Sequence, residues 1–85
     1  MTFEVRLGSK AQQFLRTCDK ELYERICAKL EKLGEEPFPH DMKRVVGAKE
    51  KTFRVRVGGY RILYIVLLDE NVVVIVNIDK KPKAY

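Results

Sequence analysis

Residues 53–64 read FRVRVGGYRILY. Two runs that alternate between apolar and polar residues flank a Gly-Gly pair, a pattern typical of a β-hairpin with a two-residue turn. If Gly58 and Gly59 form that turn, Arg56 lies directly across from Arg61, and Arg54 shares the strand face of Arg56. Like charges directly opposite one another destabilise a sheet. The hairpin therefore predicts a cluster of three guanidinium groups that holds an anion.

Further strand patterns lie on both sides of this hairpin. Strands are predicted at residues 2–7, 52–57, 60–68 and 72–78. Residues 72–76 are apolar at every position, which is typical of a central strand covered on both faces. Residues 69–71 form the turn before that strand, and residues 35–51 form a connecting loop.

Two helices are predicted between the first strand and the loop. Ser9 followed by Gln12 matches a capping box, so the first helix begins at Ser9. Asp19 can cap the second helix, in which apolar residues recur at intervals of four, four and three from Leu22 to Leu33. The order β-α-α-β-β-β predicts an α+β fold: one small two-layer domain over residues 1–85, with a helical hairpin packed on a mainly antiparallel sheet.

The composition is that of a globular protein, with 46% apolar and 34% charged residues in a chain of 85. A domain of this size buries roughly 60–65% of the surface that its unfolded chain exposes. No apolar run approaches the ~20 residues of a membrane-spanning helix, and no signal-type segment is present, so we expect a cytoplasmic protein. Cys18 and Cys27 have no Cys-x-x-Cys spacing, and we expect reduced thiols, no metal site and no cofactor.

The positive charge of the chain is concentrated in its second half. Residues 1–42 contain seven Lys and Arg against eight Asp and Glu, whereas residues 43–85 contain ten against four. Such asymmetry indicates a nucleic acid or another polyanion as partner, although a solvated basic surface has the same composition. Outside the hairpin, the candidate RNA-binding residues are Lys43, Arg44, Lys49, Lys51, Lys80 and Lys83.

A fixed set of cations can stabilise the negative charge that a phosphodiester gains when it is attacked. RNA carries its own nucleophile, the 2′-hydroxyl, so a protein that positions this group can cleave RNA without activating a water molecule. Arginine stays protonated, so the base is a lysine or Tyr85 with a pKa lowered by neighbouring cations. Tyr85 is either this base, a ring that stacks on a nucleobase, or a terminal residue without a role. His40 lies in the loop, where a bystander role is the simpler interpretation.

The chain resembles the RelE/ParE superfamily of toxins from toxin–antitoxin pairs. The resemblance lies in the element order, in FRVRVGGYRILYIV at residues 53–66, in the valine-rich strand that follows and in IDKKPKAY at residues 78–85. It covers nearly the whole chain, and the hairpin is its specific signal. It implies a RelE-like fold and, for the RelE branch, a messenger RNA interferase that cuts messages in the ribosomal A site. The ParE branch instead poisons DNA gyrase.

The resemblance also implies roles for individual residues. Arg54 and Arg56 match the basic pair before the turn, where the family commonly has lysines, and Arg61 matches the arginine in the same Gly-Tyr-Arg context. Lys81 matches a basic residue after the last strand, where RelE usually has arginine. Tyr85 matches a tyrosine near the C-terminus, at a shorter spacing. These five residues are the candidate catalytic set.

Three functions remain open at this point: a ribosome-dependent endoribonuclease, a ParE-like gyrase inhibitor without nuclease activity, and a non-catalytic RNA-binding module. The nuclease needs Lys81 and Tyr85, whereas a gyrase inhibitor does not. The expected partners of the nuclease are the ribosome, messenger RNA and a RelB-like antitoxin, which we expect to be acidic, partly disordered and bound over the basic face. No membrane partner is expected, and no homo-oligomer is required.

Overall fold

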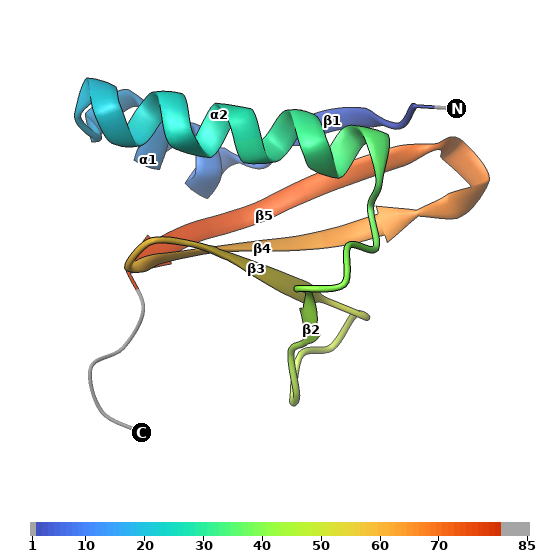
Figure 1. Ribbon diagram of the computed structural model, residues 1–85. Helices are drawn as coiled ribbons and strands as arrows, with labels where there is room; N and C mark the ends of the chain where they lie inside the picture. The colour runs from blue at the N-terminus through green and yellow to red at the C-terminus, as the bar shows by residue number, and fades with distance from the viewer. Residues whose placement is uncertain (1, 81–85) are drawn as a thin grey trace.

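The computed structural model describes residues 2–80 and consists of two helices packed on one face of a five-stranded sheet (Figure 1). Its elements in chain order are β1 (Glu4–Leu7), α1 (Ser9–Thr17), α2 (Lys20–Glu35), β2 (Lys43–Arg44), β3 (Phe53–Val57), β4 (Tyr60–Leu67), the 3₁₀ turn η1 (Leu68–Glu70) and β5 (Val72–Lys80). This is the predicted two-layer α+β fold with two short additions. β2 lies within the predicted loop, and η1 forms most of the predicted turn.

The strands are ordered β1-β5-β4-β3-β2, so β5 lies inside the sheet between β1 and β4. β1 runs parallel to β5, and the other neighbouring strands are antiparallel, so the sheet is mainly antiparallel as predicted. Two parallel neighbours need a long connection between them. The chain that connects β1 to β5 includes both helices and the strands β2, β3 and β4. The pairing of β4 with β5 shifts register between Leu63 and Tyr64.

The hydrophobic core lies between α2 and the inner face of the sheet. Ile26 and Leu33 of α2 are fully buried, as are Val55, Ile62 and Tyr64 on the strands below them. Burial of one such side chain stabilises the fold by roughly 1.5–3 kcal/mol. All four residues of the predicted apolar stripe of α2 are buried, which confirms the helical periodicity. Neither helix within residues 2–80 is long and apolar enough to cross a membrane.

The start and the end of α2 have separate anchors. Asp19 caps the helix as predicted, because its Oδ1 accepts a hydrogen bond from the backbone N of Leu22 at 2.8 Å. The helix ends at Glu35, and Pro37 follows two residues later. The buried hydroxyl of Tyr64 on β4 donates to the carbonyl of Pro37 at 2.9 Å. The segment that leaves the helix is therefore tied to the core of the sheet.

The predicted cap of α1 is wrong. Ser9 is already the first residue of the helix, and Gly8 occupies the cap position without a side-chain hydrogen bond. The cause is the tight contact with β5: the backbone N of Gly8 donates to the carbonyl of Ile75 at 2.8 Å, and a Cβ on Gly8 would lie 3.0 Å from that oxygen. The side chain of Gln12 donates instead to the last carbonyl of β1, at 2.9 Å.

The prediction that the valine-rich strand is covered on both faces is also wrong. Both helices lie on the same side of the sheet (Figure 1). Val73 and Ile75 of β5 are fully buried, whereas Val76 is 41% exposed. The apolar run thus reflects a central position in the sheet and not a second covering layer. Within residues 2–80, neither helix covers the outer face of the sheet (Figure 1), which carries the side chains that alternate with Phe53, Val55 and Val57.

Candidate nucleic-acid interface

The hairpin between β3 and β4 has the predicted register. Val57 pairs with Tyr60, Arg56 with Arg61, and Arg54 with Leu63, so the turn consists of two glycines. Gly58 has a φ of 58°, in the left-handed region that favours glycine. The glycine pair therefore fixes which arginines oppose each other.

Three arginines lie on the outer face of the sheet, as predicted. Phe53, Val55 and Val57 are buried toward the helices, so the side chains of Arg54 and Arg56 leave β3 on the opposite side. The pairing of Arg56 with Arg61 places Arg61 on that same side. Lys43 of β2 pairs with Arg54 and joins the set. We call Lys43, Arg54, Arg56 and Arg61 the outer cation cluster.

Asp79 on β5 is the residue of this face that the sequence analysis missed. It pairs with Arg61 across the sheet, and the two side chains form two parallel hydrogen bonds. Nε of Arg61 donates to Oδ1 at 2.6 Å, and Nη2 donates to Oδ2 at 3.3 Å. Both side chains are about one-third exposed, at 28% and 34%. The carboxylate orients the guanidinium group and offsets part of the positive charge.

Arg54 and Arg56 differ from Arg61 in their contacts. Within residues 2–80, neither forms an ion pair or a hydrogen bond with a carboxylate. Arg54 is half-buried and Arg56 is exposed. Their guanidinium groups can therefore accept an anion without first breaking an internal salt bridge.

The other predicted cations are distributed over two faces. Lys80 pairs with Tyr60 and not with Arg61, so the prediction that it borders the face of Arg61 is wrong. Arg44 pairs with Phe53 and likewise leaves the strand on the helix side. Lys49 and Lys51 are exposed in the segment before β3, and the Lys51 ammonium lies 5.9 Å from the ring centre of Phe53. Lys81, Lys83 and Tyr85 lie outside the described residues.

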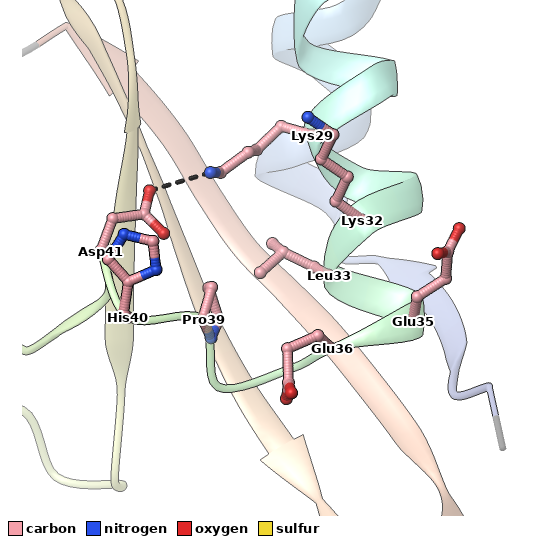
Figure 2. A pocket seen from close by; sticks show the side chains of 8 residues that line it. All are labelled: Lys29, Lys32, Leu33, Glu35, Glu36, Pro39, His40 and Asp41. Carbon is pink, nitrogen blue, oxygen red and sulfur yellow. Dashed lines mark hydrogen bonds and ion pairs between the residues drawn. The ribbon is translucent and has the colours of Figure 1, made fainter.

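A further cavity in the described part of the chain lies away from the outer face of the sheet. It has a volume of about 500 Å³ and lies between the second half of α2 and the loop that follows (Figure 2). His40 lines it, together with cations and carboxylates in similar number. Lys29 donates to Asp41 at 2.9 Å across the cavity, and this hydrogen bond lowers the pKa of the Asp41 carboxyl. Because its charges are mixed and partly paired, this cavity is a poor phosphate site.

Metal chemistry has no evident site in the described residues. Residues 2–80 contain no group of three or more His, Cys, Asp or Glu side chains that could hold a metal ion. Cys18 and Cys27 are both free thiols and half-buried. Burial is the main cause that raises the pKa of Cys18.

Comparison with known proteins gives consistent matches over the whole chain. Residues 5–85 match the family described as the ParE toxin of the type II toxin–antitoxin system parDE. A protein of Methanocaldococcus jannaschii named as toxin RelE1 is 30% identical over 88 residues, which cover 100% of this chain and 97% of that protein.

Solved structures agree with this assignment. The archaeal RelE–RelB complex from Pyrococcus horikoshii OT3 contains a chain of 26% identity and a TM-score of 0.84, covering 99% of this chain and 100% of that one. The RelBE2 toxin–antitoxin complex from Mycobacterium tuberculosis has the same fold, with a TM-score of 0.84 and 24% identity over 95% of this chain and 93% of its own. The chain therefore belongs to the RelE/ParE superfamily of toxins from type II toxin–antitoxin systems.

Proposed function

We propose that this toxin is a ribosome-dependent endoribonuclease that cuts messenger RNA in the A site without a metal ion. The observation that carries the proposal is the outer cation cluster, in which Arg54, Arg56 and Arg61 project from one strand face. The planar guanidinium fork is suited to phosphate oxygens. The 30% identity to toxin RelE1 supports the RelE branch of the superfamily.

The proposed reaction uses the 2′-hydroxyl of the message as nucleophile. The 2′-oxygen forms a bond to the neighbouring phosphorus, and the bond from phosphorus to the 5′-oxygen breaks. The proton of the 2′-hydroxyl passes to a base, and the leaving 5′-oxygen takes up a proton. The products are a 2′,3′-cyclic phosphate and a 5′-hydroxyl. The arginines stabilise the extra negative charge on the phosphate oxygens during the attack.

The acid and base are sought among Tyr85 and the lysines, and the resemblance to RelE matches Lys81 and Tyr85 to family positions. Asp79 is the titratable residue beside Arg61 in the described structure, and its carboxylate is already engaged. A site with so few acid–base groups depends on substrate geometry, which the ribosome supplies by holding the message in line for attack. The remaining predicted cations, Lys43, Arg44, Lys49, Lys51, Lys80 and Lys83, then contact RNA phosphates.

The test uses ribosomes programmed with a defined message. We expect the wild-type protein to produce message ends aligned with the A-site codon and to leave the same message intact when ribosomes are absent. A variant with both Arg54 and Arg56 changed to alanine should produce no such ends while keeping its fold by circular dichroism. If wild-type protein gives no codon-aligned ends on actively translating ribosomes, the proposal is wrong.

A second candidate is a ParE-like gyrase inhibitor, because the matching family model is that of ParE toxins. An inhibitor of this kind does not need Lys80 and the residues that follow it. Deletion of residues 80–85 should abolish growth arrest by a nuclease and leave growth arrest by a gyrase inhibitor unchanged. A supercoiling assay with purified gyrase gives the complementary result.

We further propose that a RelB-like antitoxin neutralises this toxin in the cytoplasm. The archaeal relative was solved as a RelE–RelB complex and the mycobacterial one as RelBE2. An acidic segment of the antitoxin would complement the net charge of +5 and cover the outer cation cluster. Copurification of this chain with the product of a short adjacent reading frame tests the pairing.

A further inference from the structure

A second basic concavity lies between α2 and the end of the hairpin. It has a volume of about 380 Å³, and Arg25, Lys29 and Lys32 of α2 line one side. Arg56, Val57 and Gly58 line the other side. We call this concavity the helix–hairpin cleft. It is separate from the outer face of the sheet, and Arg56 borders both.

The sequence of α2 explains the line of cations. Arg25, Lys29 and Lys32 are separated by four and three residues, so they lie on the same side of the helix. The rise between the first and the last is about 10 Å. The apolar stripe that begins at Leu22 faces the core, and the three cations lie beside it on the helix surface. The cations therefore project beside the sheet and not into it.

Arg56 can reach this cleft because it lies near an edge of the sheet. β2 pairs only with Phe53 and Arg54, so within the described residues no strand lies outside the last three residues of β3. Arg56 is exposed there, and a long side chain can bend around an unpaired strand edge. The same residue thus connects the outer cation cluster to the cleft.

Gly58 leaves room for Arg25 at the wall of the cleft. A Cβ at this position would lie 2.9 Å from Nη2 and 3.5 Å from Nη1 of Arg25. The absence of a side chain lets the guanidinium of Arg25 lie against the hairpin turn. The turn that sets the register of the outer arginines therefore also positions a cation from α2.

The described residues that line the cleft are either positively charged or uncharged. No acidic residue lines it among the described residues. Lys29 is paired with Asp41 at 2.9 Å, whereas Arg25, Lys32 and Arg56 have no carboxylate partner within residues 2–80. A concavity lined by one sign of charge concentrates the electric field and attracts ions of opposite charge.

We infer that the helix–hairpin cleft binds a second backbone phosphate of RNA, next to the phosphate held by the outer cation cluster. This inference rests on the proposed function for the identity of the nucleic acid. A helix of a partner protein needs an apolar groove with anchor pockets, and the apolar lining here consists of small residues such as Val57. A phosphate backbone needs cations alone, so RNA fits the cleft better than a protein segment does.

The test measures RNA binding separately from cleavage. The probe is a short RNA with 2′-methoxy groups, which cannot undergo the proposed reaction, and vacant ribosomes form a second arm. The variant changes Arg25 and Lys32 to glutamine. The matched control changes Lys10 and Lys20 to glutamine, because these two exposed helical lysines do not line the cleft. The salt dependence of the dissociation constant is measured for each protein.

The logarithm of the association constant falls with the logarithm of the salt concentration, and each contact to a single strand adds about 0.7 to the steepness of this fall. We expect the Arg25/Lys32 variant, which loses two contacts, to show a slope that is less steep by about 1.4. The control should keep the wild-type slope. A loss with the oligonucleotide supports the inference and assigns the cleft to the message. A loss with ribosomes alone assigns the cleft to ribosomal RNA and overturns its placement beside the phosphate that the outer cation cluster holds.

Other outcomes overturn the inference or separate it from the nuclease proposal. Equal slopes for the variant, the control and the wild type, with all three folded, overturn it even if the wild type cuts programmed ribosomes. Weaker binding of a polyglutamate peptide with unchanged RNA binding also overturns it and assigns the cleft to an acidic protein. If the slope of the Arg25/Lys32 variant becomes less steep as expected but the wild type does not cut messages on programmed ribosomes, RNA binding by the cleft is supported and the nuclease proposal is wrong.

Discussion

The carboxylate of Asp79 holds the guanidinium of Arg61 through two hydrogen bonds of 2.6 and 3.3 Å on the outer face of the sheet. This pair joins β4 to β5 at the position where Arg56 opposes Arg61 from the other side. The repulsion between the two arginines is thereby reduced, and the orientation of one is fixed. Among residues 2–80, the outer cation cluster contains four cations and pairs with one carboxylate, that of Asp79.

Replacement of Asp79 by asparagine should strengthen anion binding. The amide keeps the shape and one acceptor oxygen but removes the negative charge beside the arginines. We expect the salt dependence of the association constant for single-stranded RNA to become steeper by about 0.7, the equivalent of one additional cation. The free energy of unfolding should fall by less than about 1 kcal/mol, because the pair is partly exposed and screened by solvent.

The matched control for this change is Glu4→Gln. Glu4 accepts from Arg6 at 3.0 Å on β1, so the variant removes the same charge from another ion pair of the sheet. The Glu4 variant should leave RNA binding near the wild-type value. Equal increases for both variants would assign the effect to total charge and not to the position of Asp79.

Replacement of Arg61 by alanine should abolish growth arrest and leave the protein folded. The change removes the oriented guanidinium and leaves Asp79 at a position where water reaches it, since its side chain is 34% exposed. Arg61→Lys should retain part of the toxicity, because lysine keeps the charge but not the planar fork. Arg6→Ala is the control. Growth arrest by a folded Arg61→Ala protein would contradict the role of this arginine.

The hairpin could be predicted from sequence because its determinants are local. The alternation of Phe53 to Val57, the two glycines and the following strand set the turn, and the turn sets the pairing of Arg56 with Arg61. No contact beyond the hairpin is needed for that inference. The same reasoning located α2, whose apolar stripe and Asp19 cap are also short-range features.

The position of Asp79 could not be predicted in the same way. The predicted strand ended at residue 78, whereas β5 continues to Lys80. The register shift at Leu63 and Tyr64 also changes which residues of β4 and β5 face each other. Such a shift depends on the packing of the whole sheet. The helix–hairpin cleft could not be predicted for a related reason. In the sequence, Arg25 and Lys32 are typical of the solvent-exposed side of a helix, and the cleft becomes evident only when α2 is placed beside the hairpin.

Replacement of Tyr64 by phenylalanine should destabilise the protein at neutral pH. The hydroxyl of this fully buried residue donates to the carbonyl of Pro37 at 2.9 Å, and the variant leaves that carbonyl without its partner. We expect the free energy of unfolding to fall by about 1–2 kcal/mol in urea titrations. Tyr60→Phe is the control, because Tyr60 is half-buried and stacks edge-on against Phe14. A similar loss in both variants would contradict the role assigned to the hydroxyl of Tyr64.

The same residue should make the protein sensitive to alkaline pH. Burial raises the pKa of Tyr64 to about 12, whereas an unfolded tyrosine titrates near 10. The folded state therefore holds this proton more tightly. The resulting stability is fully present below about pH 10 and is lost as the pH rises through about 12, because the unfolded chain then releases the proton more readily.

The stability difference between the wild type and Tyr64→Phe isolates this contribution, since the lysines and the other tyrosines titrate in both proteins. Between about pH 9 and pH 12 the difference should shift by roughly 2–3 kcal/mol in favour of the variant. Urea unfolding curves at several pH values in this range measure it. A difference that stays constant across the range would mean that the phenol titrates alike in the folded and unfolded chains, and that Tyr64 does not tie the Pro37 segment to the sheet as a buried, protonated donor.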